Sequence, residues 1–100
     1  MTNIDRAMYF IGKDGESYKS VINGKTVYDG NYIKNGQKFL FVISSNKDFN
    51  FTMLTIRIHN ERFEKVFRGE NSLEEAGAEL LAAFRRIEGA AEFFRDYQKD

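Results

Sequence analysis

The stretch NGKTVYDGNYIKNG, residues 23–36, decides how the first two thirds of the chain fold. An Asn-Gly pair stands at each end of it, and Asp29-Gly30 stands between them. Asn and Asp tolerate a positive φ and Gly adopts one freely, so each pair suits a tight type I′ turn between antiparallel strands. Asp14-Gly15 precedes them at a similar interval. Four such turn signals at short intervals predict a β-meander.

The segments around these pairs have the residue types of strands. β-branched and aromatic residues are frequent in them, and the chain has no proline that would interrupt a sheet ladder. The strands that we expect are Ala7–Gly12, Ser17–Ile22, Lys25–Tyr28, Asn31–Lys34, Gln37–Ile43, Phe49–His59 and Glu61–Phe67. Phe39–Ile43 is apolar without a break, and both faces of Phe49–His59 are partly apolar. This pattern favours central strands covered on both sides, or a bulge that switches the faces of Phe49–His59.

The last third of the chain has a helical pattern. Ser72-Leu73-Glu74-Glu75 has the form of a capping box, in which the Ser72 hydroxyl accepts from the amide of Glu75. Apolar residues then recur at spacings of three and four, at Leu73, Ala76, Leu80, Phe84, Ile87, Ala91 and Phe94. The stripe continues past Gly77 and Gly89, so it predicts one long helix over residues 72–98, with Gly89 as the place for a bend.

We therefore expect a single domain over residues 1–100 with an α+β fold. An antiparallel β-meander of five to seven strands would occupy residues 1–68, and one long C-terminal helix would pack on the sheet. The order and length of the segments are also compatible with a pleckstrin-homology-like β-sandwich capped by a C-terminal helix. That alternative is an analogy of fold, which does not determine function.

The composition limits the kinds of partner and the cellular compartment that we expect for this protein. Fifteen Lys and Arg residues balance fifteen Asp and Glu residues, which argues against a partner held mainly by bulk charge, such as duplex DNA or an anionic membrane. The chain has no apolar run near the roughly 20 residues of a membrane span, and it begins without the apolar segment of a signal peptide. We expect a cytoplasmic protein that does not bind membranes.

Signals of catalysis are weak. The absence of Cys excludes disulfides, thiolate chemistry and Cys-ligated zinc, and the single histidine, His59, stands in a predicted turn. No serine lies in a Gly-x-Ser-x-Gly motif, and no glycine-rich phosphate loop occurs. The glutamates on the predicted helix suit a solvated face. We predict that the protein is not an enzyme and has no cofactor or metal site.

The sequence instead favours a small protein-interaction module, such as an inhibitor, adaptor or assembly factor, of the kind that phages and mobile elements encode. At 1.5 Å per residue the predicted helix is about 40 Å long, which exceeds the roughly 30–35 Å body of a compact domain of this size. We expect the overhanging end to bind a partner, or the same patch of a second copy in a homodimer. The residues predicted to make this contact are Phe93, Tyr97, Ala90 and Arg86.

An alternative of a different class is a single-stranded nucleic-acid-binding protein. Aromatic rings beside Lys and Arg on a sheet can stack on bases and neutralise the phosphate backbone. Most of the phenylalanines are better explained as core, because Phe has no polar tip. The residues that would form such a face are Tyr9, Tyr18, Tyr28, Lys19, Lys25 and Arg57.

Overall fold

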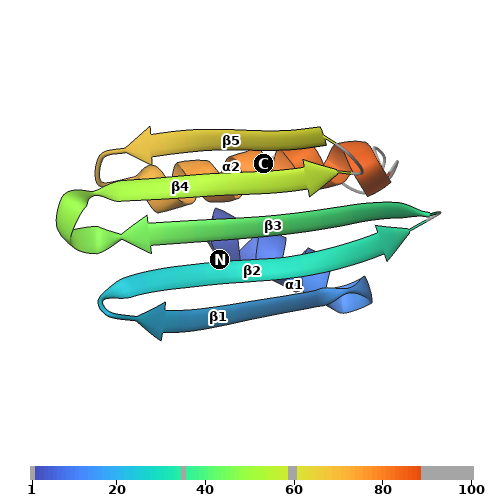
Figure 1. Ribbon diagram of the computed structural model, residues 1–100, viewed down its shortest axis with the longest axis horizontal. Coiled ribbons are helices and arrows are strands. Elements are labelled where there is room, and N and C mark those ends of the chain that lie inside the picture. Colours follow the sequence, from blue (N-terminus) through green and yellow to red (C-terminus); the bar gives the residue numbers. More distant parts are fainter. Residues whose placement is uncertain (1, 35, 59–60, 89–100) are drawn as a thin grey trace.

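The computed structural model describes residues 2–34, 36–58 and 61–88. Five strands form one antiparallel sheet in the order β1-β2-β3-β4-β5, and two helices lie together on one face of it (Figure 1). The elements are α1 (Asn3–Asp14), β1 (Glu16–Ile22), β2 (Lys25–Lys34), β3 (Gln37–Asn46), the 3-10 turn η1 (Lys47–Phe49), β4 (Phe51–Ile58), β5 (Glu61–Arg68) and α2 (Ser72–Glu88). The α+β class and the antiparallel meander are confirmed, whereas the prediction of a single helix is wrong. The described residues form one sheet, not the two packed sheets of the sandwich alternative.

The first helix occupies the segment that we expected to be the first strand, Ala7–Gly12. The hydroxyl of Thr2 caps α1 by accepting from the amide of Asp5 at 3.2 Å. Ile4, Ala7 and Ile11 fall at helical spacing, and all three are buried. A helix buries this set on one face, whereas a strand would have divided it between two faces. That burial is the reason why the strand prediction fails here.

The Asn23-Gly24 and Asp29-Gly30 pairs have different backbone conformations. Asn23 and Gly24 have φ angles of 50° and 79°, as a type I′ turn between β1 and β2 requires. Asp29-Gly30 makes no turn, and β2 runs through it, so two predicted strands are one. A Cβ on Gly30 would lie 2.6 Å from the Phe41 ring. Gly30 is therefore needed for close packing and not for a positive φ.

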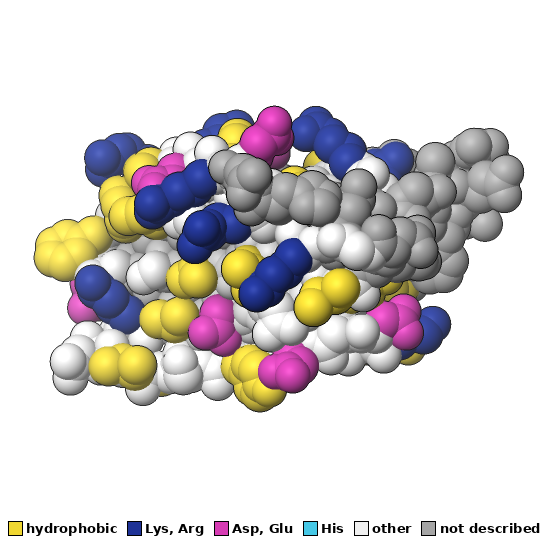
Figure 2. Space-filling view, turned by 45° about the vertical axis from the view of Figure 1, so that its right-hand side comes forward, with side chains coloured by type: hydrophobic (Ala, Val, Ile, Leu, Met, Phe, Trp, Pro, Cys, Tyr) yellow, Lys and Arg dark blue, Asp and Glu magenta, His cyan; other side chains and the backbone are white. Residues whose placement is uncertain are grey.

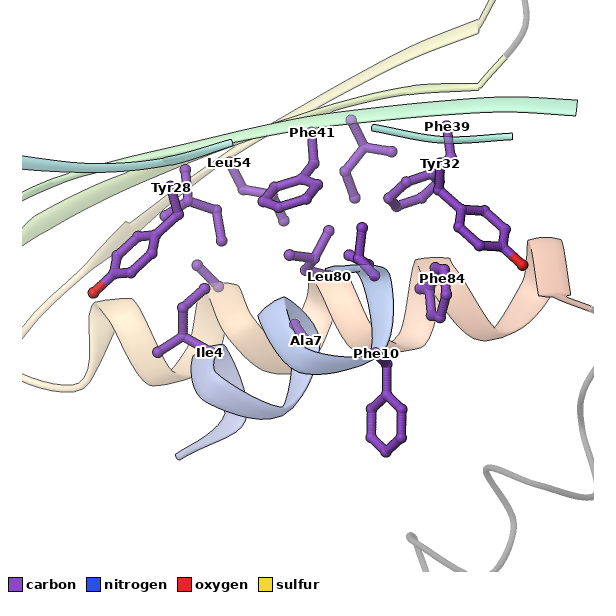
Figure 3. Close-up of a cluster of buried hydrophobic side chains, with 14 of the residues drawn as sticks. Ile4, Ala7, Phe10, Tyr28, Tyr32, Phe39, Phe41, Leu54, Leu80 and Phe84 are labelled. Carbon is purple, nitrogen blue, oxygen red and sulfur yellow. The ribbon is translucent and has the colours of Figure 1, made fainter. Parts of the chain in front are cut away.

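The core lies between the sheet and the two helices (Figure 3). On α2, the predicted stripe is confirmed at Ala76, Leu80 and Phe84, which are buried. The Phe84 ring meets the Tyr32 and Phe39 rings edge-on, with centroids 5.1 and 5.8 Å away. Leu73, at the start of the stripe, is half-buried and packs against the core. The remaining members, Ile87, Ala91 and Phe94, fall outside the described side chains, as does the predicted helix beyond Glu88.

The start of α2 is fixed by a buried hydroxyl chain and not by the predicted capping box. The amide of Glu75 donates to the carbonyl of Asn71 at 2.9 Å. The buried Ser72 hydroxyl shares a hydrogen bond of 2.8 Å with the Thr52 hydroxyl, which also shares one of 3.0 Å with Ser45. The Ser72 hydroxyl therefore bonds to Thr52 on β4 and not to the Glu75 amide, as the capping box would require.

The two helices pack closely against each other at their N-terminal ends. The amide of Asn3 donates to the Glu74 carboxylate at 2.7 Å, so α2 supplies an acceptor to the first turn of α1. Gly77 lies where the backbones meet, because a Cβ there would come within 2.6 Å of the Ile4 amide nitrogen. This contact holds the first element of the chain to the last described one.

Candidate functional site

The sheet has one face that neither described helix covers (Figure 1). It carries the even-numbered residues of β1 (16–22), β3 (38–46) and β5 (62–68), and the odd-numbered residues of β2 (25–33) and β4 (51–57). We call this surface the open face. Our expectation that β3 and β4 are covered on both sides, or that a bulge switches the faces of β4, is wrong for the described residues. The ladder between β3 and β4 is regular, and only one of its faces meets the helices.

The middle of the open face is apolar. Val42, on the central strand, is 43% exposed, and Met53 and Val66 are 36% and 45% exposed. Val27 and Leu40 lie beside them and are half-buried. When an antiparallel sheet has one face in water, that face normally carries polar side chains. Figure 2 shows apolar side chains on this side of the molecule, among Lys, Arg, Asp and Glu.

The charges of the open face are divided between its two sides. Glu16 and Asp29 lie on β1 and β2, with Lys25 at the far end of β2. Three arginines lie on the opposite side, on β4 and β5. They are Arg57, Arg62 and Arg68. Glu64 also lies there and forms an ion pair with Arg62. One side of the face is therefore more acidic and the other more basic.

A shallow hollow of about 320 Å³ lies near the acidic side, and Tyr18, Asp29, Leu40, Val42 and Arg57 are among its lining residues. The exposed Tyr18 hydroxyl donates to the Glu16 carboxylate at 2.6 Å. This hydrogen bond, followed by the negative charge of Glu16, raises the pKa of Tyr18 above its ordinary value. The Tyr18 hydroxyl is thus held as a neutral donor at the edge of the face.

The residues predicted for nucleic-acid binding do not all come together. Tyr18, Lys25 and Arg57 share the open face. Lys19 and Tyr28 lie on the helix side of the sheet, where Tyr28 is buried and the Lys19 ammonium is 5.6 Å from the centre of its ring. Tyr9 is exposed on α1 and not on a strand.

Of the predicted partner-binding residues, only Arg86 is among those that the structure describes. Phe93, Tyr97 and Ala90 lie outside the described residues, as does His59. Arg86 lines a groove of about 720 Å³ between β5 and α2, which we call the β5–α2 groove. Ile56, Ile58, Phe63 and Ala83 provide its apolar lining.

The sequence alone did not indicate either the β5–α2 groove or the open face. Phe63 faces the helix side of the sheet but remains 45% exposed, because α2 lies mainly under β3 and β4. An ion pair of 2.9 Å between Lys65 and Glu79 joins β5 to α2 at the groove. The alternation in β5 could have identified Phe63 as an inward residue, but not the extent of its cover.

No protein-family model, curated protein or solved structure matches this chain.

Within the part of the chain that the structure describes, no group of three or more His, Cys, Asp or Glu residues could hold a metal ion. The helices among those residues are too short or too polar to cross a membrane. The open face and the β5–α2 groove are the surface features from which a function can be argued.

Proposed function

We propose that this protein is a non-enzymatic interaction module, an inhibitor, adaptor or assembly factor, that binds another protein through its open face. The observation that carries the proposal is the apolar centre of that face. Its members lie on four neighbouring strands at the side away from the described helices, and they are Val27, Leu40, Val42, Met53 and Val66. A contiguous exposed apolar patch with a charged rim is typical of protein-binding surfaces.

Single-stranded nucleic acid has less support as the ligand. A stacking platform needs several exposed rings on one surface. On the open face Tyr18 is exposed, whereas Phe51 is half-buried and has the Arg68 guanidinium 5.3 Å from its ring centre. The acidic residues Glu16 and Asp29 beside Tyr18 would also repel a phosphate backbone.

The proposal is tested with a pair of matched variants, Val42→Lys and Val21→Lys. Both positions are exposed valines in strands, but Val21 lies on the opposite side of the sheet from Val42. Proteins captured on the immobilised parent chain would be identified and purified, and their binding to parent and variants measured by calorimetry. We expect Val42→Lys to weaken binding at least tenfold, which is about 1.4 kcal/mol, and Val21→Lys to leave it unchanged. Equal affinity of parent and Val42→Lys would contradict the proposal.

A further inference from the structure

We propose that the open face binds the same face of a second copy of this chain, with a two-fold axis that runs along β3. This inference rests on the proposed function and names the partner of that surface. Three properties of the open face support it. They are the distribution of its charges, the position of its apolar centre and its size.

Under this rotation the acids of β1 and β2 meet the arginines of β4 and β5, whereas Lys38, on β3 itself, meets Lys38 of the second copy. A two-fold axis along β3 places β1 over β5 of the second copy, and β2 over β4. Glu16, Asn31, Leu40, Arg57 and Arg62 lie directly opposite one another across the five strands of one copy. The rotation therefore sets Glu16 over Arg62 of the second copy and brings Asn31 over Arg57. Asp29, next along β2, also comes close to Arg57. Each acid–base contact occurs twice, as in any isologous interface.

A two-fold axis perpendicular to the strands does not give this complementarity. Such an axis can pass through the row of residues that lie opposite Val42 across the strands. Each residue of that row then faces the same residue of the second copy. Asp29 and Glu64 both belong to that row. The rotation would then place Asp29 on Asp29 and Glu64 on Glu64, and like charges placed together disfavour such a register. The axis along β3 brings one pair of like charges together, at Lys38, whereas the perpendicular axis brings two, so the charges favour the axis along β3.

The apolar centre lies where the axis passes. Val42 is in the middle of the open-face positions of β3, the middle strand, so the axis sets it against Val42 of the second copy. Val27 and Met53 lie opposite Ser44 on its two sides. They face one another across the two copies. The contact would have apolar residues at its centre and charged pairs toward its rim, the arrangement common in protein interfaces.

The size of the face sets the expected strength. Five strands about 4.8 Å apart, and about eight residues at 3.3 Å, give a footprint of about 600 Å². Two copies would bury about 1,200 Å² in total, the lower end of the range for specific interfaces. Facing sheets pack about 10 Å apart with strand directions within about 30° of each other, and an axis along β3 keeps the two β3 strands parallel, so the dimer would be a β-sandwich with helices on both outer surfaces. We expect reversible association at micromolar concentrations.

The test uses opposite charges at the axis. Val42→Lys alone, or Val42→Glu alone, would place two like charges against each other, whereas an equimolar mixture would pair Lys with Glu. By sedimentation velocity at high micromolar concentration, we expect the parent to dimerise, each Val42 variant to be monomeric, and the mixture to dimerise. Val21→Lys and Val21→Glu are the controls and should dimerise like the parent. Circular dichroism melts would establish that every variant is folded.

Each other outcome overturns this inference. A parent that remains monomeric shows that the second copy is not the partner; a captured protein that loses affinity for Val42→Lys would then leave the proposed function standing. A dimer that survives both single Val42 variants forms through another surface, such as the helix end. Loss of the dimer without rescue in the mixture places Val42 away from the axis and overturns the geometry.

Discussion

At the scale of single residues, Thr52 shows how a tertiary contact replaces a local one. It is completely buried on β4, and its hydroxyl shares hydrogen bonds with Ser45 and Ser72. We predict that Thr52→Val, which keeps the shape but leaves the buried Ser72 hydroxyl without this partner, destabilises the fold by about 1–3 kcal/mol in urea denaturation.

Two further variants control this prediction. Thr55→Val is the same change on the same strand, but Thr55 faces the open side, so we expect less than about 0.5 kcal/mol. Removal of both hydroxyls in Thr52→Val with Ser72→Ala should cost less than the sum of the single changes, because the buried Ser72 hydroxyl is removed together with its partner and only the half-buried Ser45 hydroxyl loses one. Additive costs would contradict the hydroxyl chain.

The titration of Tyr18 provides a second test at this scale. The hydrogen bond to Glu16 and the charge of Glu16 raise the Tyr18 pKa, so the folded state holds this proton more tightly than the unfolded state. The contribution of Tyr18 to stability is thus present below about pH 10, the ordinary tyrosine pKa, and is lost as the pH rises through the folded-state value. We predict that Glu16→Gln lowers the pKa of Tyr18, measured by NMR titration of its ring carbons in dilute protein. The same pKa in parent and Glu16→Gln would disprove the assigned cause; Glu75→Gln, on α2, is the control.

At the scale of elements, the sequence correctly predicted a turn, strands and a helix that are indicated by residues close together in the chain. The Asn23-Gly24 turn, the strands near Ser17–Ile22 and Glu61–Phe67, and the stripe on α2 all follow from residue type and spacing. The first helix was missed because its apolar residues are also good strand formers, although Thr2 and Asp5 were a capping signal within reach. The Asp29-Gly30 pair was misleading for a different reason, since only the close approach of the Glu16 carbonyl and the Phe41 ring explains why glycine is there.

The contact between the two helices is open to a direct test at Gly77. Alanine is favoured over glycine by about 1 kcal/mol inside a helix, but a Cβ at Gly77 would lie 2.6 Å from the Ile4 nitrogen of α1. Overpacking typically costs 1–3 kcal/mol, so we predict that Gly77→Ala is destabilising by about 1 kcal/mol net. Ala78→Gly, at the exposed neighbouring position, measures the propensity alone. If Gly77→Ala raises the urea midpoint, the close approach of the helices is refuted.

At the scale of the whole molecule, the two faces of the sheet differ. Both described helices lie on one face, and the other face has an apolar centre. The sequence indicated that β3 and β4 have apolar residues on both faces, but not that one face lacks a covering layer among the described elements. Which strand pairs with which, and in what register, decides that Val27, Met53 and Val66 meet. These long-range pairings are set by packing, so the open face could be found only in three dimensions.

The chain also contains reporters for its open face. It has three methionines, of which Met53 lies on the open face and Met8 packs against the core from α1, while Met1 is outside the described residues. The methyl NMR signals of Met53 and Met8 are therefore a matched probe and control. A dilution series of the purified chain, followed by addition of any captured partner, would report whether the open face becomes covered.

These methyl signals test whether the open face is the surface through which the protein binds another protein. We expect the Met53 signal to shift or broaden as the protein associates with its own copy or with a partner, while the Met8 signal stays in place. Association that moves the Met8 signal and leaves the Met53 signal unchanged would show that the open face remains in contact with water in the bound state and is not the binding surface.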